Sequence, residues 1–97
     1  MKPSLSLKMH LNEVRRILEG RGMRNPSLFG STARGEDTGR SDVDILVEAP
    51  PGTSLFDLAD AELELEKLLD CKVEVMTRGF LAPDVAERVE ADLIPLA

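Results

Sequence analysis

The stretch LFGSTARGE at residues 28–36, followed by SDVDILV at residues 41–47, decides the fold of this 97-residue chain. The apolar segment Ser27–Phe29 is predicted to be a short strand that ends at Gly30, and Gly30–Arg40 is rich in Gly, Ser, Thr and charge. The Val, Ile and Leu content of Asp42–Glu48 is typical of a strand buried on both faces. Two strands joined by a long polar loop predict an α/β sheet that need not be all parallel.

The sequence before and after these two strands predicts further helices and strands. Helical spacing of apolar residues predicts a first helix over Leu7–Glu19, capped by Ser6 and ended by Gly20 and Gly22. The remaining predictions are a helix over Ser54–Leu69, a strand over Lys72–Thr77, a short helix from Ala82 or Pro83 to Val89, and an apolar edge at Leu93–Leu96. The chain length fits one small domain over residues 1–97, built as a mixed β-sheet flanked by helices.

Composition narrows the classes of function. The net charge is −6, from 18 acidic and 12 basic residues, so the chain repels a phosphate backbone and is not expected to bind nucleic acid stably. Aromatic residues make up 3%, all Phe, which leaves few surfaces for stacking bases. No apolar run approaches the ~20 residues of a membrane span, and no signal peptide is evident. The single cysteine, Cys71, fits a reducing cytoplasm.

The residues with the clearest chemistry are Gly30, Ser31, Asp42 and Asp44. Gly30 lacks a side chain and lets a phosphate approach its backbone, while Ser31 offers a hydroxyl and can begin a short helical turn. Asp42 and Asp44 are two apart on a strand, so both side chains point to one face, where they repel each other unless a cation lies between them. Magnesium prefers such oxygen ligands and completes its shell with substrate phosphates.

Two other residues are candidates for the same site. Glu74 alternates with Val73 and Val75 on a predicted strand and could supply a third carboxylate, as a metal ligand and as a base. Whether it shares a face with the two aspartates is not decided by the sequence. The guanidinium of Arg34 could contact a triphosphate, or it could balance the acidic residues at positions 36 and 37 on the surface.

The segments at residues 28–36 and 41–47, with KVEVMTR at residues 72–78, closely resemble the minimal nucleotidyltransferases of the DNA polymerase beta-like superfamily. The resemblance covers nearly the whole chain. It implies a small polymerase-beta-like core in which Gly30 and Ser31 hold the triphosphate of ATP, and Asp42 and Asp44 bind Mg²⁺. Glu74 would take the third acidic place, where the family usually has Asp.

The most similar members of that family are antitoxins that transfer AMP from ATP to a tyrosine of a HEPN-domain toxin. The resemblance therefore implies adenylylation of such a toxin. Because one small core cannot enclose an acceptor, a second chain is expected to bind it. Two alternatives stay open: nucleotidyl transfer to a small molecule with a helper subunit or a homo-oligomer, and a non-catalytic module that masks a toxin.

Overall fold

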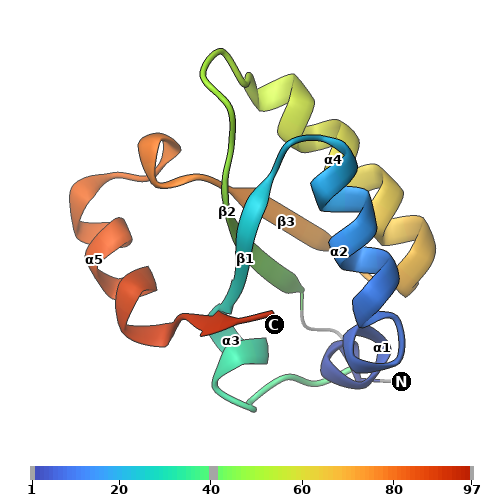
Figure 1. Ribbon diagram of the computed structural model, residues 1–97. Coiled ribbons are helices and arrows are strands. Elements are labelled where there is room, and N and C mark those ends of the chain that lie inside the picture. Colours follow the sequence, from blue (N-terminus) through green and yellow to red (C-terminus); the bar gives the residue numbers. More distant parts are fainter. Residues whose placement is uncertain (1, 40–41, 97) are drawn as a thin grey trace.

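A four-stranded mixed sheet forms the centre of the computed structural model, which describes residues 2–39 and 42–96 (Figure 1). The strands run in the order β3-β2-β1-β4; β1 is antiparallel to both β2 and β4, and β2 is parallel to β3. Their bounds are Arg24–Phe29 for β1, Val43–Glu48 for β2, Val73–Met76 for β3 and Ile94–Pro95 for β4. The mixed sheet and the edge position of the C-terminal tail are thus confirmed.

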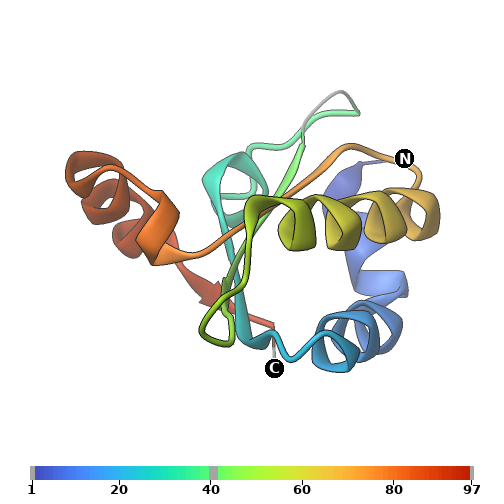
Figure 2. The ribbon, with the colours of Figure 1, turned by 90° about the horizontal axis from the view of Figure 1, so that it is seen from above.

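Helices lie on both faces of the sheet (Figure 2). One face carries α2 and α4, with α1 packed against both, and the other carries α5 with α3 beside it. The bounds are Pro3–Met9 for α1, Leu11–Gly20 for α2, Gly30–Ala33 for α3, Leu55–Leu69 for α4 and Pro83–Asp92 for α5, with a single 3₁₀ turn, η1, at Arg78–Phe80. In the described part of the chain, no helix is long and apolar enough to cross a membrane.

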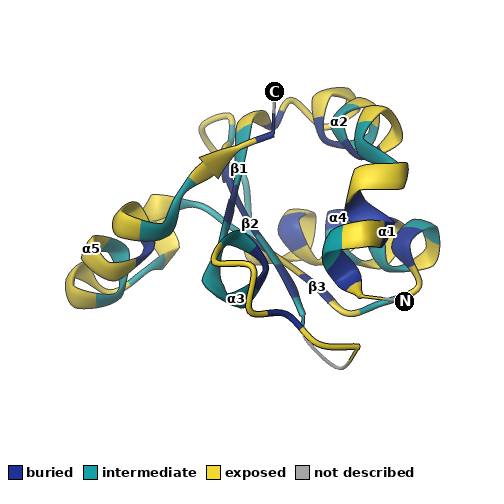
Figure 3. Ribbon diagram, turned by 90° about the horizontal axis from the view of Figure 1, so that it is seen from below, coloured by how far each residue is buried: buried dark blue, intermediate teal, exposed yellow. Residues whose placement is uncertain are grey.

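The core lies between the sheet and the pair α2 and α4. The buried side chains of β2 and β3 that point to this face are Val43, Ile45, Val47, Val73 and Val75. They pack against Leu58, Ala61, Leu65 and Leu69 of α4, which are also buried. Figure 3 shows the buried segments on the strands and on the inner sides of α2 and α4, whereas most of α5 is exposed.

The N-terminal helix differs from the prediction. The predicted helix over Leu7–Glu19 is two helices that meet at His10, whose φ of −117° and ψ of 21° interrupt α-helical geometry. Pro3 opens α1, since the missing N–H of proline costs nothing in a first turn. Ser6 is not a cap: its hydroxyl donates to the carbonyl oxygen of Leu69 at 2.7 Å and so ties α1 to the end of α4.

The segment after β1 is also more ordered than a plain loop. Gly30–Ala33 forms one helical turn, as the sequence allowed for Ser31, and the chain continues as turns and coil to residue 39. The predicted loop residue Arg40 and the motif residue Ser41 lie outside the described residues. Where the chain resumes, Asp42 leads into β2, and the amide of Val43 donates to the carbonyl of Lys72 at 2.9 Å.

Candidate active site

Gly30 marks the point where β1 turns into α3, and it lies directly against Asp44. Phe29, the last residue of β1, pairs with Asp44 across the antiparallel ladder. The backbone of Gly30 has a φ of +73°, and a Cβ atom placed there would come 2.6 Å from Oδ2 of Asp44. Both the left-handed backbone and the close approach require glycine. The position of the turn beside the carboxylate therefore depends on the absence of a side chain at residue 30.

Thr32 fixes this turn to the start of β2. Its buried hydroxyl donates to the backbone oxygen of Asp42 at 2.9 Å, and the amide of Glu36 donates to the carbonyl of Ser31 at 2.9 Å. These bonds hold Ser31 and Asp42 near one another although ten positions separate Thr32 from Asp42. Sequence reasoning did not single out Thr32, and its place directly after the Gly-Ser pair is the only signal that could have found it.

Asp44 and Glu74 come together across two parallel strands. They are direct partners in the β2–β3 register, and their carboxyl groups lie close enough for a hydrogen bond between them to raise the pKa of Asp44. Residues paired in this way point to the same face of a sheet, so Glu74 does share the face of Asp44. The neighbours of Glu74, Val73 and Val75, are buried on the opposite face. The question that the sequence left open is thus answered.

The environment of Asp44 disfavours its charged form. Burial of the half-buried carboxyl, the hydrogen bond to Glu74, and repulsion by Glu74 and then by Asp42 raise its pKa from 3.8 to about 7, while Arg34 opposes the rise. A hydrogen bond between two carboxyl groups requires a proton on one of them. Near neutral pH, Asp44 is therefore partly protonated, and a divalent cation could replace that proton.

Arg34 makes two ion pairs. Its Nε donates to Glu36 and its Nη1 to Asp92 of α5, both at 2.7 Å. The ion pair with Glu36 agrees with the interpretation that Arg34 balances acidic residues on the surface. Asp37, the other acidic residue considered, does not pair with Arg34. The buried carboxylate of Asp37 accepts a hydrogen bond from the amide of Ser4 at 3.0 Å, which is the main reason that its pKa is lowered. A role of Arg34 toward a triphosphate stays a prediction.

The donor chemistry of the carboxylates fits magnesium, although they do not form a ready-made cage. Within residues 2–39 and 42–96, no three His, Cys, Asp or Glu side chains converge closely enough to hold a metal ion. Asp44 nevertheless lies close enough to Glu74 and to Asp42 for both acidic groups to raise its pKa. A magnesium ion prefers oxygen ligands and would relieve the repulsion between these carboxylates, with water and phosphate oxygens completing its coordination shell.

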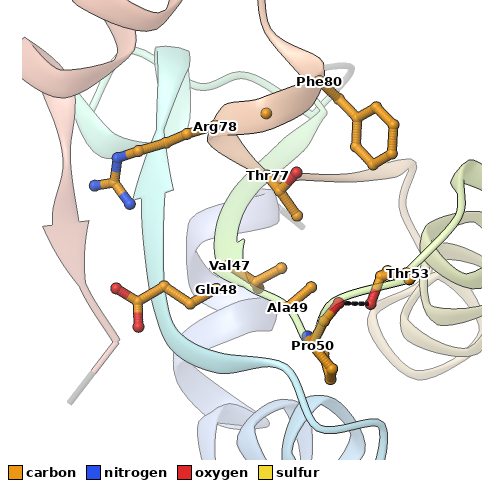
Figure 4. Close-up of a pocket in the computed structure, with 10 residues that line it drawn as sticks. Val47, Glu48, Ala49, Pro50, Thr53, Thr77, Arg78 and Phe80 are labelled. Carbon is orange, nitrogen blue, oxygen red and sulfur yellow. Dashed lines mark hydrogen bonds between the residues drawn. The ribbon is translucent and has the colours of Figure 1, made fainter.

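A separate open pocket of about 370 Å³ lies at the other ends of β2 and β3 (Figure 4). Its lining includes Glu48, Thr53, Thr77, Arg78 and Phe80, and the hydroxyl of Thr53 donates to the carbonyl of Pro50 at 2.7 Å. None of the predicted site residues lines it. The pocket is therefore distinct from the carboxylate site.

The mixed sheet, the Gly-Ser turn after β1 and the carboxylates on β2 and β3 define the class of protein as a nucleotide-transferring enzyme of the polymerase-beta-like fold. A model of the nucleotidyltransferase domain family matches residues 7–95. The chain belongs to this family.

Relatives of known name agree with that assignment. A protein named as a protein adenylyltransferase from Methanocaldococcus jannaschii is 41% identical over 84% of this chain and 91% of its own length. The protein adenylyltransferase MntA of Thermococcus cleftensis is 35% identical over 91% of this chain and 86% of its own length.

Solved structures share the fold. A structure described as a minimal nucleotidyltransferase is 35% identical, with a TM-score of 0.82, covering 95% of this chain and 94% of the other. A more distant neighbour is the complex of a tri-AMPylated HEPN toxin of Shewanella oneidensis with its MNT antitoxin. It has a TM-score of 0.73 at 18% identity, and the match covers 93% of this chain and 71% of the other. At that identity, the likeness concerns the fold alone.

Proposed function

We propose that this protein is a magnesium-dependent protein adenylyltransferase that transfers AMP from ATP to a tyrosine of a HEPN-domain toxin and thereby acts as its antitoxin. The observation that carries the proposal is the direct pairing of Asp44 with Glu74 beside Gly30. This pairing places two carboxyl groups next to the turn where a triphosphate can approach the backbone.

Each residue has a separate role in the proposed reaction. Gly30 and Ser31 bind the triphosphate of ATP, and Arg34 contacts it after leaving Glu36 or Asp92. Asp42 and Asp44 hold Mg²⁺, with Glu74 as a further ligand. Bound there, the metal would offset negative charge on the phosphates and on the leaving pyrophosphate. Glu74 lies on the side of Asp44 away from Gly30 and is placed to accept the proton of an attacking hydroxyl.

Three features support a protein acceptor. The relatives that are 41% and 35% identical are both named as protein adenylyltransferases. The chain has no tyrosine, so a modified tyrosine must belong to another molecule. The net charge of −6 also suits a basic partner. The choice of a HEPN-domain toxin follows from the resemblance of the motifs to those of antitoxins, and the complex of similar fold is consistent with it.

The test is to incubate the protein with ATP and magnesium, with and without a HEPN-domain protein encoded in a neighbouring gene. Mass spectrometry of both chains should find AMP on a tyrosine of the partner, and the adduct should be lost in Asp42→Asn. An adduct on Ser or Thr of this chain, formed equally fast without the partner, would refute the proposal. Magnesium-dependent ATP binding and toxin neutralisation without any adduct would select the masking module instead.

A further inference from the structure

A groove of about 300 Å³ follows the outer edge of β3 immediately beyond Glu74. Asp42 and Glu74 line its acidic side, and Leu55, Leu58 and Met76 form apolar walls. Leu55 is 56% exposed although it is large and apolar. An exposed leucine beside reactive carboxylates is a surface that a partner side chain can cover.

The order of the strands decides which reactant this groove can take. Gly30 follows β1 and touches Asp44 from one side, while Glu74 on β3 touches it from the other. In phosphoryl transfer the attacking and leaving oxygens lie roughly in line on opposite sides of the phosphorus. With the triphosphate at the β1 side, the acceptor approaches from the β3 side, where the groove opens.

The edge of β3 excludes one mode of docking. The amides of Val73 and Val75, which face away from β2, donate to the carboxylates of Glu66 and Glu62 on α4 at 3.1 Å and 2.8 Å. These bonds cover the donors that a partner strand would need in order to join the sheet. They also hold α4 against β3. A partner therefore reaches the groove with a side chain rather than with a strand.

We propose that this groove receives the acceptor tyrosine and that Leu55 and Met76 are specificity-determining residues for it. The inference rests on the proposed function and adds the place where the acceptor binds. The ring packs on Leu55 and Met76, a favourable contact for a thioether and an aromatic ring, and the hydroxyl points to Glu74. Because Asp42, Glu62 and Glu74 outnumber the one cation in the lining, Lys72, the segment that carries the tyrosine is basic.

The reaction in this arrangement is balanced. The phenol oxygen forms a bond to the α-phosphorus of ATP as the bond from that phosphorus to the bridging oxygen breaks, and pyrophosphate leaves with the electron pair. The phenol proton passes to the carboxylate of Glu74 and from there to water. A serine or threonine would leave the walls of Leu55 and Met76 exposed, so the groove discriminates against both.

Peptide binding tests this inference without depending on AMP transfer. Since the chain contains no Trp and no Tyr, the fluorescence of acetyl-Arg-Tyr-Arg-amide can be followed in the presence of magnesium without background. Leu55→Ala should raise the dissociation constant about five- to tenfold, the loss expected from truncating a partly covered leucine. Leu63→Ala is the matched control, because Leu63 is 57% exposed on the same helix and does not line the groove. It should change the constant less than twofold.

The outcomes separate this inference from the proposed function. Equal affinities for Leu55→Ala and Leu63→Ala, no detectable binding, or equally tight competition by acetyl-Arg-Ser-Arg-amide would overturn the groove assignment. In transfer assays, an increase in KM for the tyrosine peptide in Leu55→Ala with unchanged KM for ATP supports it. Peptide binding that depends on Leu55, without AMP transfer by the wild-type protein, would refute the proposed function but still support the groove as the binding site for the tyrosine.

Discussion

Gly30 and Asp44 are in contact across the junction of β1 and β2, such that a Cβ atom at residue 30 would come 2.6 Å from Oδ2 of Asp44. The contact joins the turn that is expected to bind phosphate to the carboxylate that is expected to bind metal. Asp44 is held in place by its strand pairing with Phe29 on one side and with Glu74 on the other.

Gly30→Ala should therefore lower both stability and activity. The positive φ of +73° costs about 1–2 kcal/mol for any residue with a Cβ atom, and displacement of Asp44 adds about 1–3 kcal/mol. Gly35→Ala is the matched control, since Gly35 has a φ of +71° but nothing within 4 Å of its added Cβ. Urea unfolding should show a larger loss for Gly30→Ala, together with a loss of AMP transfer. Equal losses in the two variants would mean that the contact with Asp44 is unimportant.

Asp42→Asn and Asp44→Asn should each reduce AMP transfer ~100-fold or more while the fold stays intact, because an amide is a poorer magnesium ligand than a carboxylate. Asp60→Asn, on the exposed side of α4, is the control and should keep full activity. Transfer rates with near-saturating ATP and circular dichroism spectra are the measurements. Wild-type rates in either site variant would remove that residue from the site.

The raised pKa of Asp44 predicts a specific pH dependence of stability in metal-free buffer. The folded state keeps a proton up to about pH 7 that the unfolded chain releases near 3.8. Stability is therefore lost as pH rises through this interval. Asp44→Asn removes that penalty and should be more stable than wild type at pH 8 by about 1–3 kcal/mol, a range reduced for partial exposure. At pH 4 the two should be nearly equal. A stability difference that does not change with pH would contradict the raised pKa.

The local parts of this fold were predictable because neighbouring residues determine them. Strand β2, helix α4 and the turn at Gly30 follow from short patterns of apolar residues and glycine. Contacts between distant segments were not predictable. The shared face of Asp44 and Glu74 depends on the register of two strands that α4 separates. The same holds for the bond from Ser6 to Leu69, which spans 63 positions and links two helices of the core.

Substitution of Arg34 distinguishes the two roles that the sequence left open for this residue. If its guanidinium binds the triphosphate, Arg34→Lys should raise KM for ATP about tenfold, because lysine cannot reproduce a bidentate contact. If it only balances Glu36 and Asp92, the KM should not change. Stability should change little in either case, since both ion pairs are at the surface, where solvent screens them. Arg78→Lys, which alters the exposed ion pair with Glu90 away from the site, is the control.

Glu74 is the residue whose length should matter most. It reaches Asp44 from the neighbouring strand and lines the groove in which we place the acceptor. Glu74→Gln keeps the size of the side chain but cannot take a proton, so AMP transfer should fall ~100-fold or more while magnesium-dependent ATP binding remains. Glu74→Asp restores the carboxylate that the family usually has there and should recover at least a tenth of the rate. The measurements are ATP binding by calorimetry and AMP transfer rates for both variants. If Glu74→Gln transfers AMP at the wild-type rate, Glu74 has no role in catalysis, and another group must accept the proton of the acceptor.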